Sequence, residues 1–222
     1  MSHNKSLLTS KQQEFLTFFN HYPDLYQNFY FSGGTALAEF YLQHRFSEDL
    51  DFFSLIEINP HEINLFLNSH KIEFSSPQIQ FRQSFNRNLF FLTYTDNSKL
   101  KLEFTYYPFP QLEIPQQQDN LKIDSVFDIA VNKIFTLSQQ ARGRDYFDLY
   151  IIEQKYSFSF EKLIKKAREK FDYPIDYLQL GINFNQVDHY LDDPILLKKI
   201  NHEEISVFFK KEAQKLKNKI VK

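Results

Sequence analysis

The feature that most constrains this chain is a pair of adjacent glycines, Gly33 and Gly34, between two apolar segments. Glycine adopts backbone angles that other residues avoid, and only four glycines occur in 222 residues. Two side by side therefore indicate a turn that the fold requires. The aromatic run 29–31 before them is typical of a buried strand, and residues 35–43 after them carry apolar side chains at helical spacing. The sequence predicts a strand, a glycine turn and a helix.

A second strand is predicted over residues 50–55, and it brings two carboxylates to one surface. Asp49 and Asp51 lie two residues apart, so their side chains project from the same face of a strand. Backbone N–H groups at the start of a helix favour phosphates, and paired carboxylates hold divalent cations that neutralise a triphosphate. A Gly-Gly turn or an Asp-x-Asp pair is common by itself. Their combination indicates a nucleotide site.

The composition limits which other chemistries are available. The chain has no cysteine, so a metal must be held by oxygen or imidazole, which favours a hard cation such as magnesium. The seven histidines include no i,i+4 pair, which argues against zinc. Neither a Gly-x-Ser-x-Gly elbow nor a Walker motif occurs. Because no run approaches about 18 apolar residues and the first ten lack a secretory signal, we expect a cytoplasmic protein that does not enter membranes.

The pattern of elements changes along the chain. A capping box at Ser10 precedes a packing helix, a further helix is predicted at 61–69, and strands are predicted at 81–83, 89–94 and 100–106. Beyond these strands only helices are predicted, at 126–140, 146–153, 161–170 and 203–219. The three glutamines 116–118 are interpreted as a linker. We therefore divide the chain into an α/β part, residues 1–115, and a helical part, residues 116–222.

The two ends of the chain differ in charge. Residues 198–222 hold eight lysines and three glutamates, a net charge of +5, whereas residues 1–197 carry a net charge of −7. Two interpretations of this basic tail remain open: a solvated helix face, which is the commoner case, or a surface for the phosphate backbone of RNA.

Three segments together resemble a known family. Gly33-Gly34-Thr35-Ala36-Leu37 followed by Arg45-Phe46-Ser47-Glu48-Asp49-Leu50-Asp51-Phe52 resembles the first motif of the AbiEii/AbiGii-type nucleotidyltransferases, a branch of the polymerase-β-like superfamily. The stretch from Asp128 to Lys133 is similar to that family's Asp-x4-Lys motif, and 144–149 looks like its Arg-Asp-x-x-Asp-Leu stretch. The resemblance spans residues 31–150. Thr136 departs from it, since the motif usually has alanine there.

The resemblance implies an α+β fold. The expected architecture is a polymerase-β-like nucleotidyltransferase core over residues 1–115, a small mixed sheet with flanking helices, followed by a C-terminal helical region over residues 116–222.

The resemblance also implies roles for residues of the first part. Asp49 and Asp51 become the metal-binding and catalytic pair, holding magnesium with manganese as the alternative. Glu103 is the candidate for a third carboxylate with the same two roles, metal binding and catalysis. Strict alternation with its apolar neighbours equally predicts a solvated position. Gly33 and Gly34 would cradle the triphosphate. For Ser32 and Thr35 two roles remain open, hydroxyl contacts to the nucleotide or helix capping.

In the second part, Lys133 lies within an apolar helix, and a phosphate partner explains it better than Asp128, five residues earlier. Lys133 is thus a catalytic and nucleotide-binding candidate. Arg144, Asp145 and Asp148 are candidates for nucleotide contact or for a structural clamp, since the two aspartates share a helical face. Arg45, in the first motif, either approaches the phosphates or closes the turn onto the strand.

These expectations describe a magnesium-dependent nucleotidyltransferase. It would transfer a nucleoside monophosphate from an NTP to an acceptor, either tRNA or protein, as the toxin of a bacterial toxin–antitoxin pair with an antitoxin protein as partner. Two alternatives remain: a housekeeping or antibiotic-type transferase with a small-molecule acceptor, and a nucleotide- or RNA-binding protein without catalysis. Retention of Asp49, Asp51 and Lys133 argues against the last of these.

Overall fold

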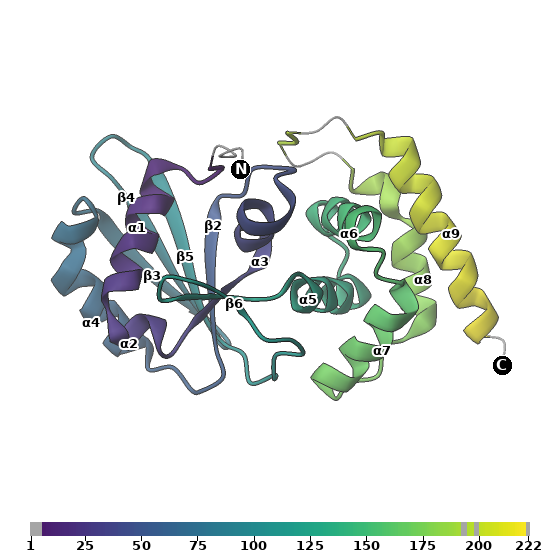
Figure 1. Cartoon of the computed structure of the whole chain (residues 1–222), viewed down its shortest axis with the longest axis horizontal. Coiled ribbons are helices and arrows are strands. Elements are labelled where there is room, and N and C mark those ends of the chain that lie inside the picture. The colour runs from purple at the N-terminus through teal and green to yellow at the C-terminus, as the bar shows by residue number, and fades with distance from the viewer. Residues whose placement is uncertain (1–5, 192–194, 198–199, 221–222) are drawn as a thin grey trace. The chain divides into compact units, whose positions relative to one another are not determined.

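The computed structural model describes residues 6–191, 195–197 and 200–220. The chain forms two compact units, one of Met1–Pro110 with Ile114–Ser125 and the other of Gln111–Glu113 with Val126–Lys222 (Figure 1). Residues 116–118, which we interpreted as a linker, instead form a strand at the edge of the first unit's sheet.

The first unit is built on a seven-stranded mixed sheet in the order β3-β4-β5-β2-β1-β7-β6. Strand β1 is parallel to β7 and β2 is parallel to β5, while the other neighbours are antiparallel. The α+β fold with a mixed sheet is confirmed. The strands are β1 Tyr30–Ser32, β2 Asp49–Ser54, β3 Gln78–Ser84, β4 Arg87–Thr93, β5 Lys99–Tyr106, β6 Gln116–Gln118 and β7 Leu121–Ile123.

One face of this sheet is covered by aromatic packing. The ring of Phe52 on β2 stacks on Phe19 at 4.5 Å and on Phe104 at 5.1 Å between centroids. Phe90 on β4 lies edge-on to Phe104. Because successive strand residues alternate between faces, this packing turns Asp49 and Asp51 to the opposite face. The predicted separation of the two faces of β2 is confirmed.

The helices of the first unit are α1 Ser10–His21, α2 Pro23–Tyr26, α3 Gly33–Ala36, the π-helix η1 Leu37–Leu42, α4 Pro60–His70 and the 3-10 helix η2 Lys71–Phe74. The capping box of α1 is centred on Thr9, with Gln12 as its reciprocal partner, one residue before the predicted Ser10. The Gln12 amide also donates to the backbone carbonyls of Ser47 and Glu48. These two added bonds explain why the capping box is centred on Thr9 rather than on Ser10.

The second unit is helical. Its helices are α5 Val126–Gln139, α6 Gly143–Tyr156, α7 Phe160–Phe171, α8 Tyr177–Asn185, the 3-10 helix η3 Val187–His189 and α9 His202–Ile220. Helix α8 was not predicted. The C-terminal helical region is confirmed, and so is the apolar stripe of α9: Ile205, Phe209, Ala213 and Leu216 are buried. The side chain of Ile220, the last member of the predicted stripe, lies outside the described part.

Candidate functional site

Strand β1 passes directly into the helical segment at the glycines. Ser32 ends β1 with extended angles, and Gly33 follows with φ of 76°, a value that favours glycine. The Ser32 hydroxyl is buried and donates to Oδ2 of Asp124 at 2.8 Å, so it does not cap the helix. The predicted strand, turn and helix are all present, but the helix begins at Gly33 itself.

Gly33 has no room for a side chain, because the Asp51 carboxylate fills the space beside it. A Cβ on Gly33 would lie 2.1 Å from Oδ2 of Asp51 and 2.8 Å from its Cγ. The register explains this closeness, since Ser32 pairs with Asp51 between the antiparallel strands β1 and β2. The glycine turn and the carboxylate pair are therefore one structural unit.

Gly34 is constrained in the same way by Arg45. A Cβ on Gly34 would lie 2.5 Å from Nη2 of Arg45 and 3.0 Å from Oγ of Ser47. The Arg45 side chain is buried, and its Nη1 donates to the carbonyl of Phe46 at 2.9 Å. Arg45 thus lies against the turn and joins it to the segment that leads into β2.

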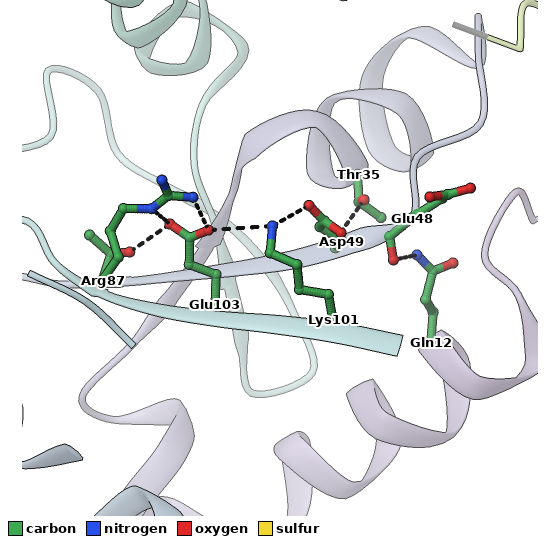
Figure 2. A network of polar contacts seen from close by, with 8 residues as sticks. Gln12, Thr35, Glu48, Asp49, Arg87, Lys101 and Glu103 are labelled. Atoms are coloured by element: carbon green, nitrogen blue, oxygen red, sulfur yellow. Dashed lines mark hydrogen bonds and ion pairs between the residues drawn. The ribbon is translucent and has the colours of Figure 1, made fainter. Parts of the chain in front are cut away.

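Thr35 supplies another connection between the turn and the strand. Its hydroxyl donates to the backbone carbonyl of Asp49 (Figure 2). The start of the helix is therefore tied to the backbone at the first carboxylate, which fixes where the Asp49 side chain begins.

We call the sheet face that carries Asp49 and Asp51, opposite the aromatic packing, the open face. On this face carboxylates alternate with cations (Figure 2). Nζ of Lys101 lies 2.6 Å from Oδ2 of Asp49 and 3.7 Å from Oε2 of Glu103. Arg87 donates to both oxygens of Glu103, from Nε and Nη2, at 2.6 Å each. The result is a continuous line of charges from Arg87 on β4 through Glu103 and Lys101 on β5 to Asp49 on β2.

Glu103 lies directly opposite Asp51, because β2 and β5 are paired in parallel in that register. It projects from the face that alternation predicted, but it is only 6% exposed rather than solvated. Burial raises its pKa, and the hydrogen bonds and charge of Arg87, the charge of Lys101 and the Thr105 hydroxyl together bring the pKa below its ordinary value. Glu103 is held ionised by its neighbours.

The donors on this face suit a divalent cation at the Asp49 and Asp51 pair. Magnesium prefers oxygen ligands and is usually held by one or two carboxylates together with water and substrate phosphates. Within the described residues no three acidic, histidine or cysteine side chains converge as a metal site. Both oxygens of Glu103 are bonded to Arg87. The geometry thus offers two carboxylates for a metal, with Glu103 beside them.

The second unit contains the other predicted residues in a cluster of its own. Nζ of Lys133 on α5 lies 2.7 Å from Oδ1 of Asp145 and 2.7 Å from Oδ2 of Asp148, both on α6 and both buried. Arg142 adds a bond from Nε to Oδ2 of Asp145 at 3.0 Å. Arg144 is exposed. The predicted clamp of Arg144 with Asp145 and Asp148 is not formed among the described residues; Lys133 and Arg142 hold these aspartates instead.

Asp128 serves a different cluster. It accepts hydrogen bonds from the backbone N–H groups of Leu112 and Glu113, and Nζ of Lys170 lies 2.7 Å from its Oδ1. Both side chains of the Asp128 and Lys170 pair are fully buried. Sequence reasoning missed Lys170, whose position on the apolar stripe of α7 was the available signal.

Comparison with known proteins shows the family of this chain. The sequence model described as "Nucleotidyl transferase AbiEii toxin, Type IV TA system" matches residues 19–219. The chain belongs to this AbiEii family. It is a nucleotidyltransferase by family, as the motifs at Gly33 and Asp49 predicted.

Individual relatives of this AbiEii protein extend the comparison. The uncharacterized protein aq_aa25 of Aquifex aeolicus is 30% identical over 192 residues, which cover 84% of this chain and 87% of that protein. The crystal structure of JHP933 from Helicobacter pylori has a TM-score of 0.58 at 22% identity and covers 96% of this chain and 94% of that one. MenT4, a nucleotidyltransferase toxin of Mycobacterium tuberculosis, has a TM-score of 0.59 at 14% identity over 93% of this chain and 84% of its own. The two structures support the fold.

No helix among the described residues is both long and apolar enough to pass through a lipid bilayer.

Proposed function

We propose that this AbiEii protein transfers a nucleoside monophosphate from an NTP to tRNA or protein, and that it is the toxin of a bacterial toxin–antitoxin pair whose antitoxin binds it. The cytoplasm is the expected compartment. The observation that carries the proposal is the contact between Gly33 and the Asp51 carboxylate, which sets a backbone turn suited to phosphate beside a pair of metal-binding oxygens.

In the proposed reaction an acceptor hydroxyl attacks the α-phosphorus of the NTP. A bond forms between the hydroxyl oxygen and that phosphorus, the bond to the β-phosphate oxygen breaks, and pyrophosphate leaves. The hydroxyl proton passes to a carboxylate or to water. A magnesium ion, or manganese, held by Asp49 and Asp51 would neutralise the triphosphate and the charge that develops on the leaving group.

The remaining residues are assigned supporting roles in this proposal. The backbone at Gly33 and Gly34 receives the phosphates, while Ser32 and Thr35 hold the turn to Asp124 and to β2. Arg45 lies behind the turn. Glu103, kept ionised by Arg87, orients Lys101 toward Asp49. On the resemblance of its Asp-x4-Lys motif, Lys133 is proposed as a phosphate ligand; within its own unit Asp145 and Asp148 set its position, and Arg144 lies on the surface.

The experiment that tests this proposal supplies each α-labelled NTP with magnesium, total tRNA and total cell protein, and identifies the labelled macromolecule. We expect label in one macromolecule with the wild-type chain, and none with Asp51→Asn or with a chelator. Label in a small molecule would instead support the alternative transferase. The proposal fails if the folded wild-type chain labels no acceptor from any of the four nucleotides.

A further inference from the structure

The hairpin of β3 and β4 has an unusual composition for this acidic unit. Residues 78–93 contain two arginines, four phenylalanines and no acidic residue, although the whole chain has 28 acidic residues. A basic and aromatic segment of this kind suits the phosphates and bases of nucleic acid. The hairpin lies in the same sheet as the carboxylates, and β5 is the strand between its β4 and β2.

The hairpin side chains divide between the two faces of the sheet. Phe81 and Phe90 pack together on the core face, with ring centroids 5.0 Å apart. The hairpin side chains that alternate with these core-facing residues lie on the open face, in register with the carboxylates. One row consists of the cross-strand neighbours Arg82, Leu89, Glu103 and Asp51, and a second consists of Gln80, Phe91, Lys101 and Asp49.

These rows connect the site to the edge of the sheet. Cross-strand neighbours project to the same face, and adjacent strands are about 4.8 Å apart. Three such steps place Arg82 roughly 14 Å from Asp51 along the open face. If an extended strand of nucleic acid were bound on this face with its end at the carboxylates, its next nucleotides would lie over β4 and β3.

The groups along this path fit a single strand of nucleic acid. The Arg82 guanidinium lies over the Phe91 ring, 5.3 Å from its centre, so a cation–π contact positions it, and the Arg82 side chain remains exposed. Among the described residues no carboxylate pairs with Arg82 or with the exposed Lys99. Both cations are thus available to phosphates.

Phe85, at the tip of the hairpin, gives an independent signal. Its side chain is 96% exposed, and its φ is 51°, in the left-handed region that bulky residues avoid. The two-residue turn between Ser84 and Arg87 accounts for the positive φ. The turn does not require an aromatic side chain, however, and Phe85 is exposed where a base can stack on it.

The basic tail is less suited to this role than its sequence indicated. In helix α9, Lys210 pairs with Asp188 at 2.6 Å, Lys215 pairs with Glu212, and Lys219 pairs with Glu161 at 2.5 Å. Much of its charge is therefore balanced locally, whereas the hairpin contains no acidic residue.

We propose that the open face of the β3–β4 hairpin binds the acceptor as a single-stranded RNA end. A base stacks on Phe85, and the Arg82 guanidinium, which lies over the Phe91 ring, contacts the phosphates together with Lys99. That the bound RNA is the acceptor rests on the proposed function. RNA binding itself can be measured without nucleotide transfer.

The test compares two double variants that each remove one exposed cation and one exposed apolar side chain. Arg82→Gln/Phe85→Asn changes the hairpin, and asparagine tolerates the left-handed backbone at that position. Lys71→Gln/Ile72→Asn is the matched control on η2, where Lys71 is exposed and Ile72 is 80% exposed. Binding of a fluorescein-labelled 12-nucleotide single-stranded RNA is measured by anisotropy at several salt concentrations, and NTP binding is measured in parallel.

We expect the hairpin variant to raise the RNA dissociation constant at least about fivefold, because stacking on one aromatic ring is worth that much or more. The slope of log affinity against log salt should fall by about 0.7 for the lost phosphate contact. The control variant should bind RNA like the wild type, and NTP binding should be equal in all three proteins.

Equal RNA affinity in the hairpin variant and the control would overturn the inference, and so would a wild-type chain that binds no RNA or labels a protein acceptor. The proposed function fails by a different result, the absence of label transfer by the wild-type chain. If the wild-type chain transfers no label but the hairpin variant still loses RNA binding, the proposed reaction is rejected. The RNA-binding surface on the hairpin is then still supported.

Discussion

The Asp51 carboxylate occupies the space that a side chain on Gly33 would need, since a Cβ at Gly33 would lie 2.1 Å from Oδ2 of Asp51. Two features 18 positions apart in the sequence thereby depend on each other. The glycine is required by its positive φ and also by the carboxylate beside it. Any change at Gly33 is therefore a change at the candidate metal site.

Gly33→Ala should lower both stability and activity. A non-glycine residue held at a φ of 76° is strained, which costs about 1–3 kcal/mol of unfolding free energy. The added methyl group must also displace Asp51, and a displacement of about 1 Å can reduce a reaction rate about a hundredfold. Urea unfolding and label transfer measure the two effects.

Gly181→Ala is the matched control for that change. Gly181 lies inside helix α8, and a Cβ there meets no atom within 4 Å. Alanine in a helix is more favourable than glycine by about 0.5–1 kcal/mol. We expect a slightly more stable and fully active protein, and a similar loss from both glycine substitutions would contradict the role of Gly33.

Asp49→Asn and Asp51→Asn should each abolish transfer while the fold remains intact. Both side chains are half-buried on the open face rather than in the aromatic core, and each substitution removes a charged metal ligand. Transfer assays and thermal melting of the same samples check the prediction. An active Asp49→Asn protein, or wild-type activity in a chelator, would disprove it.

Lys133→Ala should weaken NTP binding and also destabilise the second unit. Sequence reasoning expected binding to suffer more than stability, but the structure adds the buried Asp145 and Asp148, which would lose their shared cation. Removing one partner of a buried pair costs about 3–5 kcal/mol. Thermal melting and NTP titration below the transition separate the two effects.

Arg142→Ala provides the comparison within the same cluster. The Arg142 side chain is 51% exposed and contacts Asp145 alone of the two aspartates, so its loss should cost no more than about 1 kcal/mol. A Lys133→Ala protein that melts like the Arg142→Ala protein would show that the buried clamp contributes little to stability.

Arg87→Met should make stability depend on pH in a predictable direction. The pKa of Glu103 is raised by burial but lowered further by Arg87, Lys101 and Thr105, with a net shift downward. Ionised Glu103 therefore stabilises the fold above its unfolded pKa of about 4.3, and this contribution is lost as the pH falls through the lower folded pKa. We expect Arg87→Met to be less stable than the wild type at pH 7, with a smaller difference at about pH 3.

Urea unfolding at the two pH values measures this difference. Arg82→Met, on the same face but without a carboxylate partner among the described residues, is the control and should show no such pH dependence. A stability difference for Arg87→Met that is the same at both pH values would mean that Glu103 is not the group through which Arg87 acts.

The sequence by itself determined the local elements and the faces of the chain. The strand, glycine turn and helix around Gly33, the common face of Asp49 and Asp51, and the buried stripe of α9 were all predicted. Each follows from spacing within a few residues, because backbone angles and side-chain periodicity are set locally. Family membership followed from the same short motifs.

Only the tertiary structure decided which of those residues meet. The strand register placed Glu103 beside Asp51 and under Arg87, and helix packing joined Lys133 to Asp145 and Asp148. Strand β6, which looked like a linker, was settled by pairing with β7. These contacts depend on how distant segments align, and local periodicity carries no information about that alignment. The charge that surrounds each carboxylate, and hence its chemistry, is therefore a property of the fold.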